Sequence, residues 1–201
     1  ANILGNLVNR TISMTNKYFG GVVADKGVTA PEDEDLKAVV LEAVKKADAK
    51  MDQLRVADAI TEIFNIFRRS NKYIDETAPW VLAKDEEKKD RLSTVLYNLT
   101  EAITIGASLL ESFMPETSAK ILAQLNTAKR SLDELQTFGL YPSGNQVTEK
   151  PEILFARMDV KEVLAKAEAL PAAQAAEVEQ ESGADAENAE EENGRDLQPK
   201  A

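Results

Sequence analysis

The chain has 201 residues, of which 43% are hydrophobic, 29% are charged and 5% are aromatic. This length fits one domain with room for a tail, and the scarcity of aromatic residues favours a helical bundle over a β-sandwich or barrel. Cysteine and histidine are absent, which excludes disulfides, thiolate metal sites and histidine-based acid–base catalysis. The sequence shows no long apolar run and no signal-peptide pattern, so we expect no membrane span and a cytoplasmic location.

The net charge of −11 is unevenly distributed along the chain. Residues 171–201 carry nine acidic and two basic residues, which leaves a net charge of −4 for residues 1–170. Because the C-terminal stretch has almost no bulky apolar side chains, we expect one helical domain at 1–170 and a disordered acidic tail at 171–201. A mildly acidic body argues against a protein that binds mainly through phosphates, but not against one that reads a few bases.

Residues 2–18 are predicted to form a helix that ends at Gly20–Gly21. Polar side chains recur along it every three to four residues and therefore share one face: Asn2, Asn6, Asn9, Arg10, Ser13, Asn16 and Lys17. Neutral amides dominate where Lys and Glu would be usual. An amide carries both a donor and an acceptor, which suits it to the edges of nucleobases. An ordinary solvated face is the alternative interpretation.

Two more helices are predicted before the middle of the chain. The first opens at Thr29–Glu32, which has capping-box spacing, and breaks near residues 49–52. The next covers about residues 53–73 and has a basic last turn, as the helix dipole prefers. Its expected core-facing residues are Ala57, Ile60, Ile63, Phe64 and Phe67.

The chain's only tryptophan, Trp80, follows Pro79 directly and lies between two long helical patterns. Thr77 is placed to cap a new helix that has Pro79 in its first turn. If the indole is exposed at such a junction, it forms a stacking platform for a nucleobase. If it is buried, it is a core residue, which is the commoner fate of large aromatics.

The strongest helical pattern covers about residues 88–112 and is interrupted by Gly106, which predicts a close contact with another helix. Met114–Pro115 ends this pattern, and a shorter helix is expected at Glu116–Leu125. Residues 126–150 are rich in turn formers. An extended piece at 151–159 and a last helix at Val160–Ala169 are expected to follow.

Four segments occur in the order GNLVNRTISMTNKYFGG, NKYIDETAPWVLAK, ESFMPETSAKILAQL and LFARMD. Together they resemble the anticodon-binding domain of bacterial methionyl-tRNA synthetases, which are class I aminoacyl-tRNA synthetases. The resemblance covers residues 1 to about 168. It implies an all-α fold, a helix bundle of the class I synthetase anticodon-binding type, which recognises the CAU anticodon of methionine tRNAs by base stacking and hydrogen bonding.

The resemblance also implies four anticodon-binding residues. Asn6 and Arg10 match the family's N-L-x-x-R pattern, and Pro79 and Trp80 match its A-P-W motif. It implies that the tryptophan stacks on the first anticodon base, cytosine, while the other three help to hold the unstacked loop. Their helical spacing independently places Asn6 and Arg10 on one face. The family's F-P-R-I-D-like motif reads FARMD here, so that turn is expected to differ.

The same resemblance indicates what the chain lacks. The HIGH-like and KMSKS-like motifs that bind ATP in class I synthetases are missing. We therefore expect a non-catalytic fragment of a methionine-tRNA ligase that has no cofactor or metal of its own, although the parent enzyme uses ATP. The expected partners are the anticodon loop of tRNA(Met) and the missing catalytic domain, with no DNA and no membrane.

Two alternatives from other classes remain. A helical scaffold could bind a protein partner through one groove, and it would expose Leu or Met rather than an amide-rich face beside a lone tryptophan. A self-contained enzyme would have to use carboxylates and lysines as its acid–base groups. The sequence offers two pairs of acids, Glu32/Asp35 and Asp85/Glu86. They look more like acids at the start of a helix and on the solvated surface than like catalytic pairs.

Overall fold

The computed structural model describes residues 3–155 and Leu164. Residues 3–155 belong to one compact unit. The expected last helix at 160–169, the domain limit at residue 170 and the tail at 171–201 lie outside the described residues. None of the helices in the described residues combines the length and the hydrophobicity that a membrane span needs.

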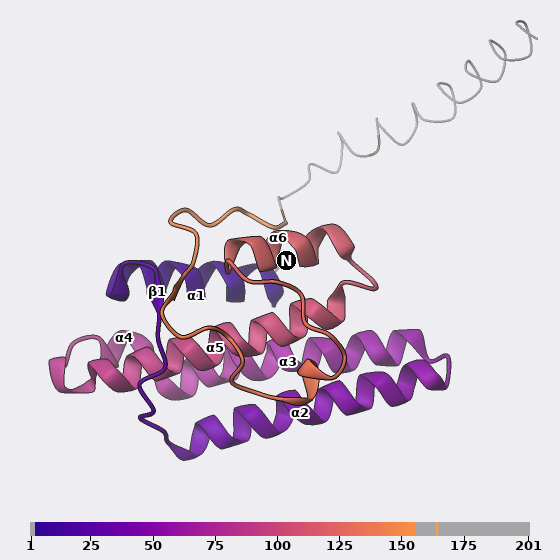
Figure 1. The fold of residues 1–201 in the computed structure, drawn as a ribbon, viewed down its shortest axis with the longest axis horizontal. Helices are drawn as coiled ribbons and strands as arrows, with labels where there is room; N and C mark the ends of the chain where they lie inside the picture. The colour runs from indigo at the N-terminus through magenta and orange to yellow at the C-terminus, as the bar shows by residue number, and fades with distance from the viewer. Residues whose placement is uncertain (1–2, 156–163, 165–201) are drawn as a thin grey trace, which may run out of the picture. The chain divides into compact units, whose positions relative to one another are not determined.

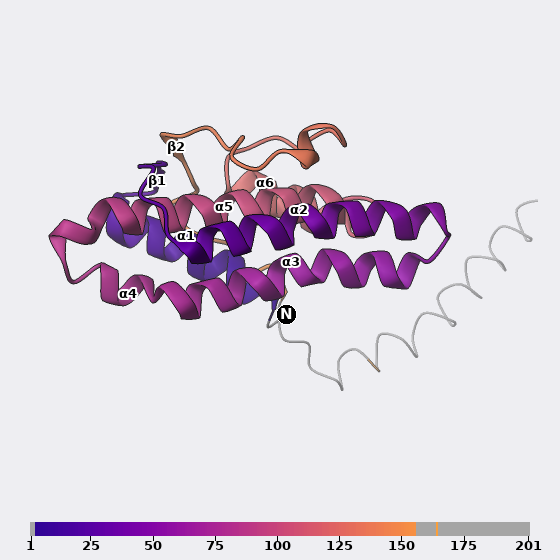
Figure 2. The same ribbon diagram turned by 90° about the horizontal axis from the view of Figure 1, so that it is seen from below.

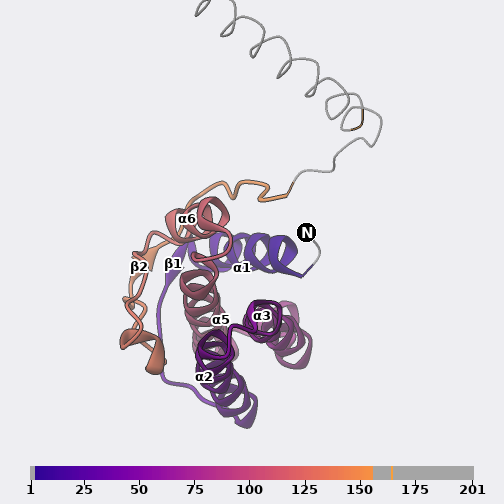
Figure 3. The same ribbon diagram turned by 90° about the vertical axis from the view of Figure 1, so that its right-hand side faces the viewer.

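Five helices longer than a single turn dominate the described part of the chain, which confirms the prediction of an all-α bundle. They are α1 (Leu4–Phe19), α2 (Pro31–Asp52), α3 (Val56–Thr77), α5 (Lys89–Leu110) and α6 (Pro115–Gln124). Figure 1 shows α2, α3 and α5 running side by side, and the end-on view in Figure 3 places α1 and α6 on the opposite side of α5. The one-turn helix α4 (Pro79–Leu82) continues from the end of α3 at one end of the bundle (Figure 2).

Helix α5 is the centre of the core. Every residue from Leu92 to Ser108 is buried, as expected for a helix that other elements cover on all sides. The hydroxyls of Thr100, Thr104 and Ser108 donate to backbone carbonyls four residues earlier, each at 2.8 Å. These hydrogen bonds let polar side chains lie in the core without unsatisfied donors.

Gly106 allows the close helix contact that the sequence predicts, and its partner is Phe67 of α3. A Cβ atom added at Gly106 would lie 2.5 Å from Cε1 of Phe67. We therefore expect Gly106→Ala to lower the free energy of unfolding by about 1–3 kcal/mol, because overpacking outweighs the better helix propensity of alanine. Urea unfolding measures this difference. An unchanged or higher unfolding free energy would contradict the contact.

The helix ends differ from the sequence expectations at two places. At the start of α2, the pairing is between Ala30 and Asp33 instead of Thr29 and Glu32, since the Ala30 N–H donates to Asp33 Oδ2 at 3.0 Å. Helix α3 runs to Thr77, four residues beyond the predicted end. Arg69 is consequently not in its last turn; this residue is buried and pairs with Asp35 of α2 at 2.8 Å.

A small antiparallel pair joins two segments that were predicted as loops. Strand β1 (Val22–Val23) pairs with β2 (Asn145–Gln146). The segment that carries β2 covers the side of α5 away from α3 (Figure 3). Two short 3₁₀ turns, η1 (Glu86–Lys88) and η2 (Glu134–Gln136), complete the described elements.

Candidate functional site

The exposed face of α1 carries the first two predicted site residues. Leu4, Leu7, Val8 and Ile12 are buried on one side of this helix. Asn6, Arg10, Ser13 and Lys17 are exposed on the other, at spacings of four, three and four residues. Asn6 and Arg10 therefore project into solvent from neighbouring turns, and neither side chain forms a hydrogen bond or ion pair with another described residue.

Asn16, which the sequence placed in the same polar stripe, has a structural task instead. Its amide donates to the backbone carbonyls of Thr148 and Glu149 at 2.9 and 3.0 Å. These bonds fix the segment that follows β2 against the last turn of α1. The polar stripe thus contains the exposed Asn6 and Arg10, which have no hydrogen-bond partner in the described residues, and the half-buried Asn16, which holds the fold.

A sharp corner between α3 and α4 presents the other two predicted residues. Thr77 does not cap α4 as expected, because its hydroxyl donates backwards to the carbonyl of Tyr73 at 2.7 Å and so belongs to α3. The corner residue is Ala78, which adopts a left-handed conformation with φ of 41°. Such backbone costs a non-glycine residue about 1 kcal/mol or more and is often found at functional sites.

The corner exposes Trp80 and buries Pro79. Pro79 is the first residue of α4, where its missing N–H costs nothing. Trp80 keeps 43% of its surface exposed, and its indole N–H has no partner among the described residues. Leu82 and Ala83, which follow on the other side of the turn, pack against the core. The structure therefore places a partly exposed aromatic ring on an anchored support.

A buried polar network holds the end of α3 that leads into this corner. The Tyr73 hydroxyl donates to Asp33, whose carboxylate is fully buried and also accepts two hydrogen bonds from Arg91 at 2.8 and 2.9 Å. Burial raises the pKa of Tyr73 above its ordinary range, so the phenol stays a donor. The start of α2, the end of α3 and the start of α5 are thereby tied together. Sequence reasoning missed this network, since its members are far apart in the chain.

Asn71 links the helix that carries Asn6 and Arg10 to the helix that leads to Trp80. Its side-chain amide donates to the carbonyl of Ile3 at 3.0 Å and to that of Phe67 at 2.8 Å. The first of these bonds spans from α3 to the start of α1. Among the described residues, no hydrogen bond or ion pair joins Asn6, Arg10 and Trp80 to one another. The residues thus lie on two helices that the Asn71 side chain connects.

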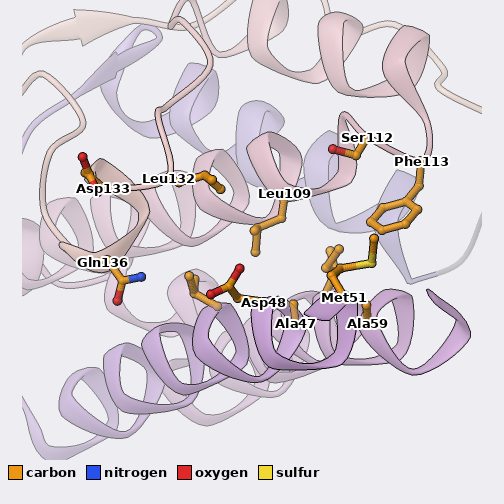
Figure 4. A pocket seen from close by; sticks show the side chains of 12 residues that line it. Ala47, Asp48, Met51, Ala59, Leu109, Ser112, Phe113, Leu132, Asp133 and Gln136 are labelled. Atoms are coloured by element: carbon orange, nitrogen blue, oxygen red, sulfur yellow. The ribbon is translucent and has the colours of Figure 1, made fainter. Parts of the chain in front are cut away.

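A separate cavity of about 280 Å³ lies at the α2–α3 turn (Figure 4). This turn is at the end of the bundle opposite α4 (Figure 1). The wall of the cavity is mainly apolar, with Met51, Leu109 and Phe113 around the carboxylate of Asp48. No hydrogen bond joins Ser112 to a carboxylate here, so the cavity shows no activated nucleophile. Among residues 3–155, no cluster of three acidic, His or Cys side chains is arranged to hold a metal ion.

Comparison with known proteins connects this geometry to a family. Residues 23–174 match the family model described as the anticodon binding domain of methionyl tRNA ligase. The chain is 46% identical over 170 residues to methionine–tRNA ligase of Clostridium perfringens, covering 85% of this chain and 26% of that protein. It is 40% identical over 169 residues to the same ligase of Bacillus subtilis, covering 82% and 25%.

Solved structures agree with the sequence comparison. The apo crystal structure of Mycobacterium tuberculosis methionyl-tRNA synthetase superposes with a TM-score of 0.73 at 29% identity, covering 79% of this chain and 32% of that one. The methionyl-adenylate-bound form of the same synthetase gives a TM-score of 0.71 at 31% identity, covering 78% and 31%. The chain spans about a quarter of the length of the curated relatives it matches. The family match over most of the chain and the shared helical fold show that this protein belongs to the anticodon-binding domains of methionyl-tRNA ligases.

Proposed function

We propose that this domain recognises the CAU anticodon loop of methionine tRNAs. The observation that carries the proposal is Trp80, a partly exposed tryptophan with an unpartnered indole on a short, anchored helix. Sequence-specific proteins usually read single-stranded RNA loops by stacking unpaired bases on aromatic rings and by hydrogen bonding to the edges of splayed bases. Trp80 supplies the ring for the first anticodon base, cytosine.

Asn6 and Arg10 supply the hydrogen bonds in this proposal. Both are exposed on one face of α1, and both lack partners among the described residues, so they can bind RNA without breaking contacts within the domain. An amide offers a donor and an acceptor, while a guanidinium offers donors only. Pro79 acts differently because it is buried: it fixes the start of α4 and thereby the direction of Trp80.

The parent protein, in the same proposal, is a methionine-tRNA ligase that joins methionine to tRNA(Met) with ATP. The domain described here contributes recognition of the tRNA and no chemical step. With a net charge of −11, the isolated chain can neutralise few phosphates. We therefore expect weak binding of the anticodon loop and a shallow dependence on salt.

Binding of a short RNA stem-loop tests the proposal directly. The CAU stem-loop should bind about tenfold or more tightly than a loop with the cytosine replaced, since one well-formed base contact is worth roughly 1–3 kcal/mol of discrimination. Asn6→Ala and Arg10→Ala should each weaken CAU binding, whereas Lys45→Ala, on the exposed side of α2, serves as control. Equal affinity for both loops would reject the proposal.

The alternative, a helical scaffold for a protein partner, is favoured by one observation at the other end of the bundle. Leu132, which lines the cavity of Figure 4, is 72% exposed, and Leu54, in the α2–α3 turn, is 87% exposed. The scaffold hypothesis expects exposed leucines. The family match and the free Trp80 favour RNA recognition instead. The stem-loop experiment separates the two hypotheses, because a scaffold would not discriminate between anticodons.

A further inference from the structure

Lys17 extends the exposed face of α1 beyond the residues assigned to the anticodon. It lies seven residues after Arg10, which is about 10 Å along the helix axis. Both side chains are exposed on the same face. Figure 1 shows that the end of α1 where Lys17 lies and the short helix α4 occupy the same end of the bundle. The face therefore runs from Asn6 towards the corner that presents Trp80.

A small hollow joins Lys17 to that corner. Its volume is about 150 Å³, and its lining includes Lys17 and Tyr18 of α1, Leu82 of α4, and Asp85, Glu86 and Lys89 where the chain turns into α5. Leu82 is two residues after Trp80 in the same helical turn. The hollow thus reaches the short helix that carries the proposed stacking platform.

The charges around the hollow leave one cation uncompensated. Asp85 pairs with Lys88 at 3.2 Å, and Glu86 pairs with Lys89 at 2.9 Å. Lys17 has no ion pair with any residue of the described range 3–155, and its amine lies 5.4 Å from the ring centre of Tyr18. An exposed ammonium beside acids that already have partners is available to bind an anion.

We infer that Lys17 binds a backbone phosphate of the RNA strand whose base stacks on Trp80, with the phosphate at the mouth of this hollow. The inference rests on the proposed function. It adds binding of the RNA backbone to the recognition of bases. A stacked base brings its own and neighbouring phosphates to the edge of the aromatic platform. Lysine binds phosphate as a point charge, and such contacts position the strand without reading its sequence.

Salt titration of stem-loop binding tests this role. For a single strand, each phosphate neutralised contributes about −0.7 to the slope of log K against log salt concentration. Lys17→Gln should make the slope shallower by about that amount and weaken binding of the CAU loop several-fold at low salt. It should weaken a cytosine-substituted loop by the same factor. Lys17→Arg should retain the slope, and Lys45→Gln, an exposed lysine on α2, should leave both slope and affinity unchanged.

The outcomes separate this inference from the proposed function. If the wild-type chain discriminates CAU but Lys17→Gln keeps the wild-type slope, the phosphate contact is wrong while anticodon recognition stands. If Lys17→Gln reduces discrimination more than affinity, Lys17 contacts a base and the phosphate assignment is also wrong. If the wild-type chain does not discriminate, the proposed function itself fails. Circular dichroism of each variant confirms that the fold is retained, as expected for an exposed side chain.

Discussion

Trp80→Ala should weaken binding of the CAU stem-loop by about one to two orders of magnitude. Stacking of a base on an aromatic side chain is worth roughly 1–3 kcal/mol by alanine substitution, and each 1.4 kcal/mol is a factor of ten in affinity. The ring is 43% exposed and makes no hydrogen bond within the described residues. Part of Trp80 is therefore accessible before RNA binds. Fluorescence anisotropy of a labelled stem-loop measures the loss of affinity.

The same substitution should cost the fold little. Removal of a fully buried tryptophan costs roughly 3–5 kcal/mol because it leaves a cavity. Trp80 already contacts solvent, and the buried residue of its short helix is Pro79. Val81→Ala is the matched control, since Val81 is 52% exposed on the same short helix. If Trp80→Ala unfolds the bundle, or if Val81→Ala weakens RNA binding equally, Trp80 is not the stacking platform.

The sequence predicts those features of the site that depend on short-range patterns. Helical spacing alone places Asn6 and Arg10 on one exposed face, because residues four apart neighbour each other on any α-helix. The helix end at Gly20 and the close approach at Gly106 follow from the chemistry of glycine, and both occur in the structure. The exposure of Trp80 could not be decided from its position, since it depends on what packs against α4.

Features that depend on distant partners could not be predicted. Thr77 is a residue type that often caps helices. In the structure, however, α3 continues through Thr77, and the corner before α4 lies at Ala78. The two-residue strand at Val22–Val23 exists only because residues 145–146 return to pair with it. Likewise, Asp33 looks like an ordinary acid in the first turn of a helix. Its full burial results from Tyr73 and Arg91, 40 and 58 residues away.

Glu101 should be the acidic residue whose loss most destabilises the domain. Its carboxylate is fully buried in α5 and forms a bidentate ion pair with Arg130, which is itself only 8% exposed. It also accepts backbone hydrogen bonds from Gly139, Leu140 and Tyr141 at 2.8, 3.1 and 2.9 Å. One side chain thereby anchors both the start and the middle of the segment that covers α5.

We expect Glu101→Gln to lower the free energy of unfolding by about 3–5 kcal/mol. The neutral amide leaves the guanidinium of Arg130 buried without a counter-charge, and removal of one partner from a buried ion pair typically costs this much. The amide also presents a donor where backbone N–H groups need an acceptor. Urea unfolding followed by circular dichroism measures the change. Glu34→Gln is the control, because Glu34 forms only an exposed pair with Lys37, and its loss should cost less than about 1 kcal/mol.

A double variant shows how much of the stability comes from the Glu101–Arg130 ion pair and how much from the hydrogen bonds that Glu101 accepts from the backbone of residues 139–141. Arg130→Met alone leaves the carboxylate with its three backbone donors and should cost less than Glu101→Gln. Glu101→Gln combined with Arg130→Met removes the uncompensated cation, so the double variant should be less destabilised than the sum of the two single changes. Strict additivity would show that the two side chains act independently. A Glu101→Gln variant as stable as Glu34→Gln would contradict the assignment of Glu101 as the anchor of residues 130–141.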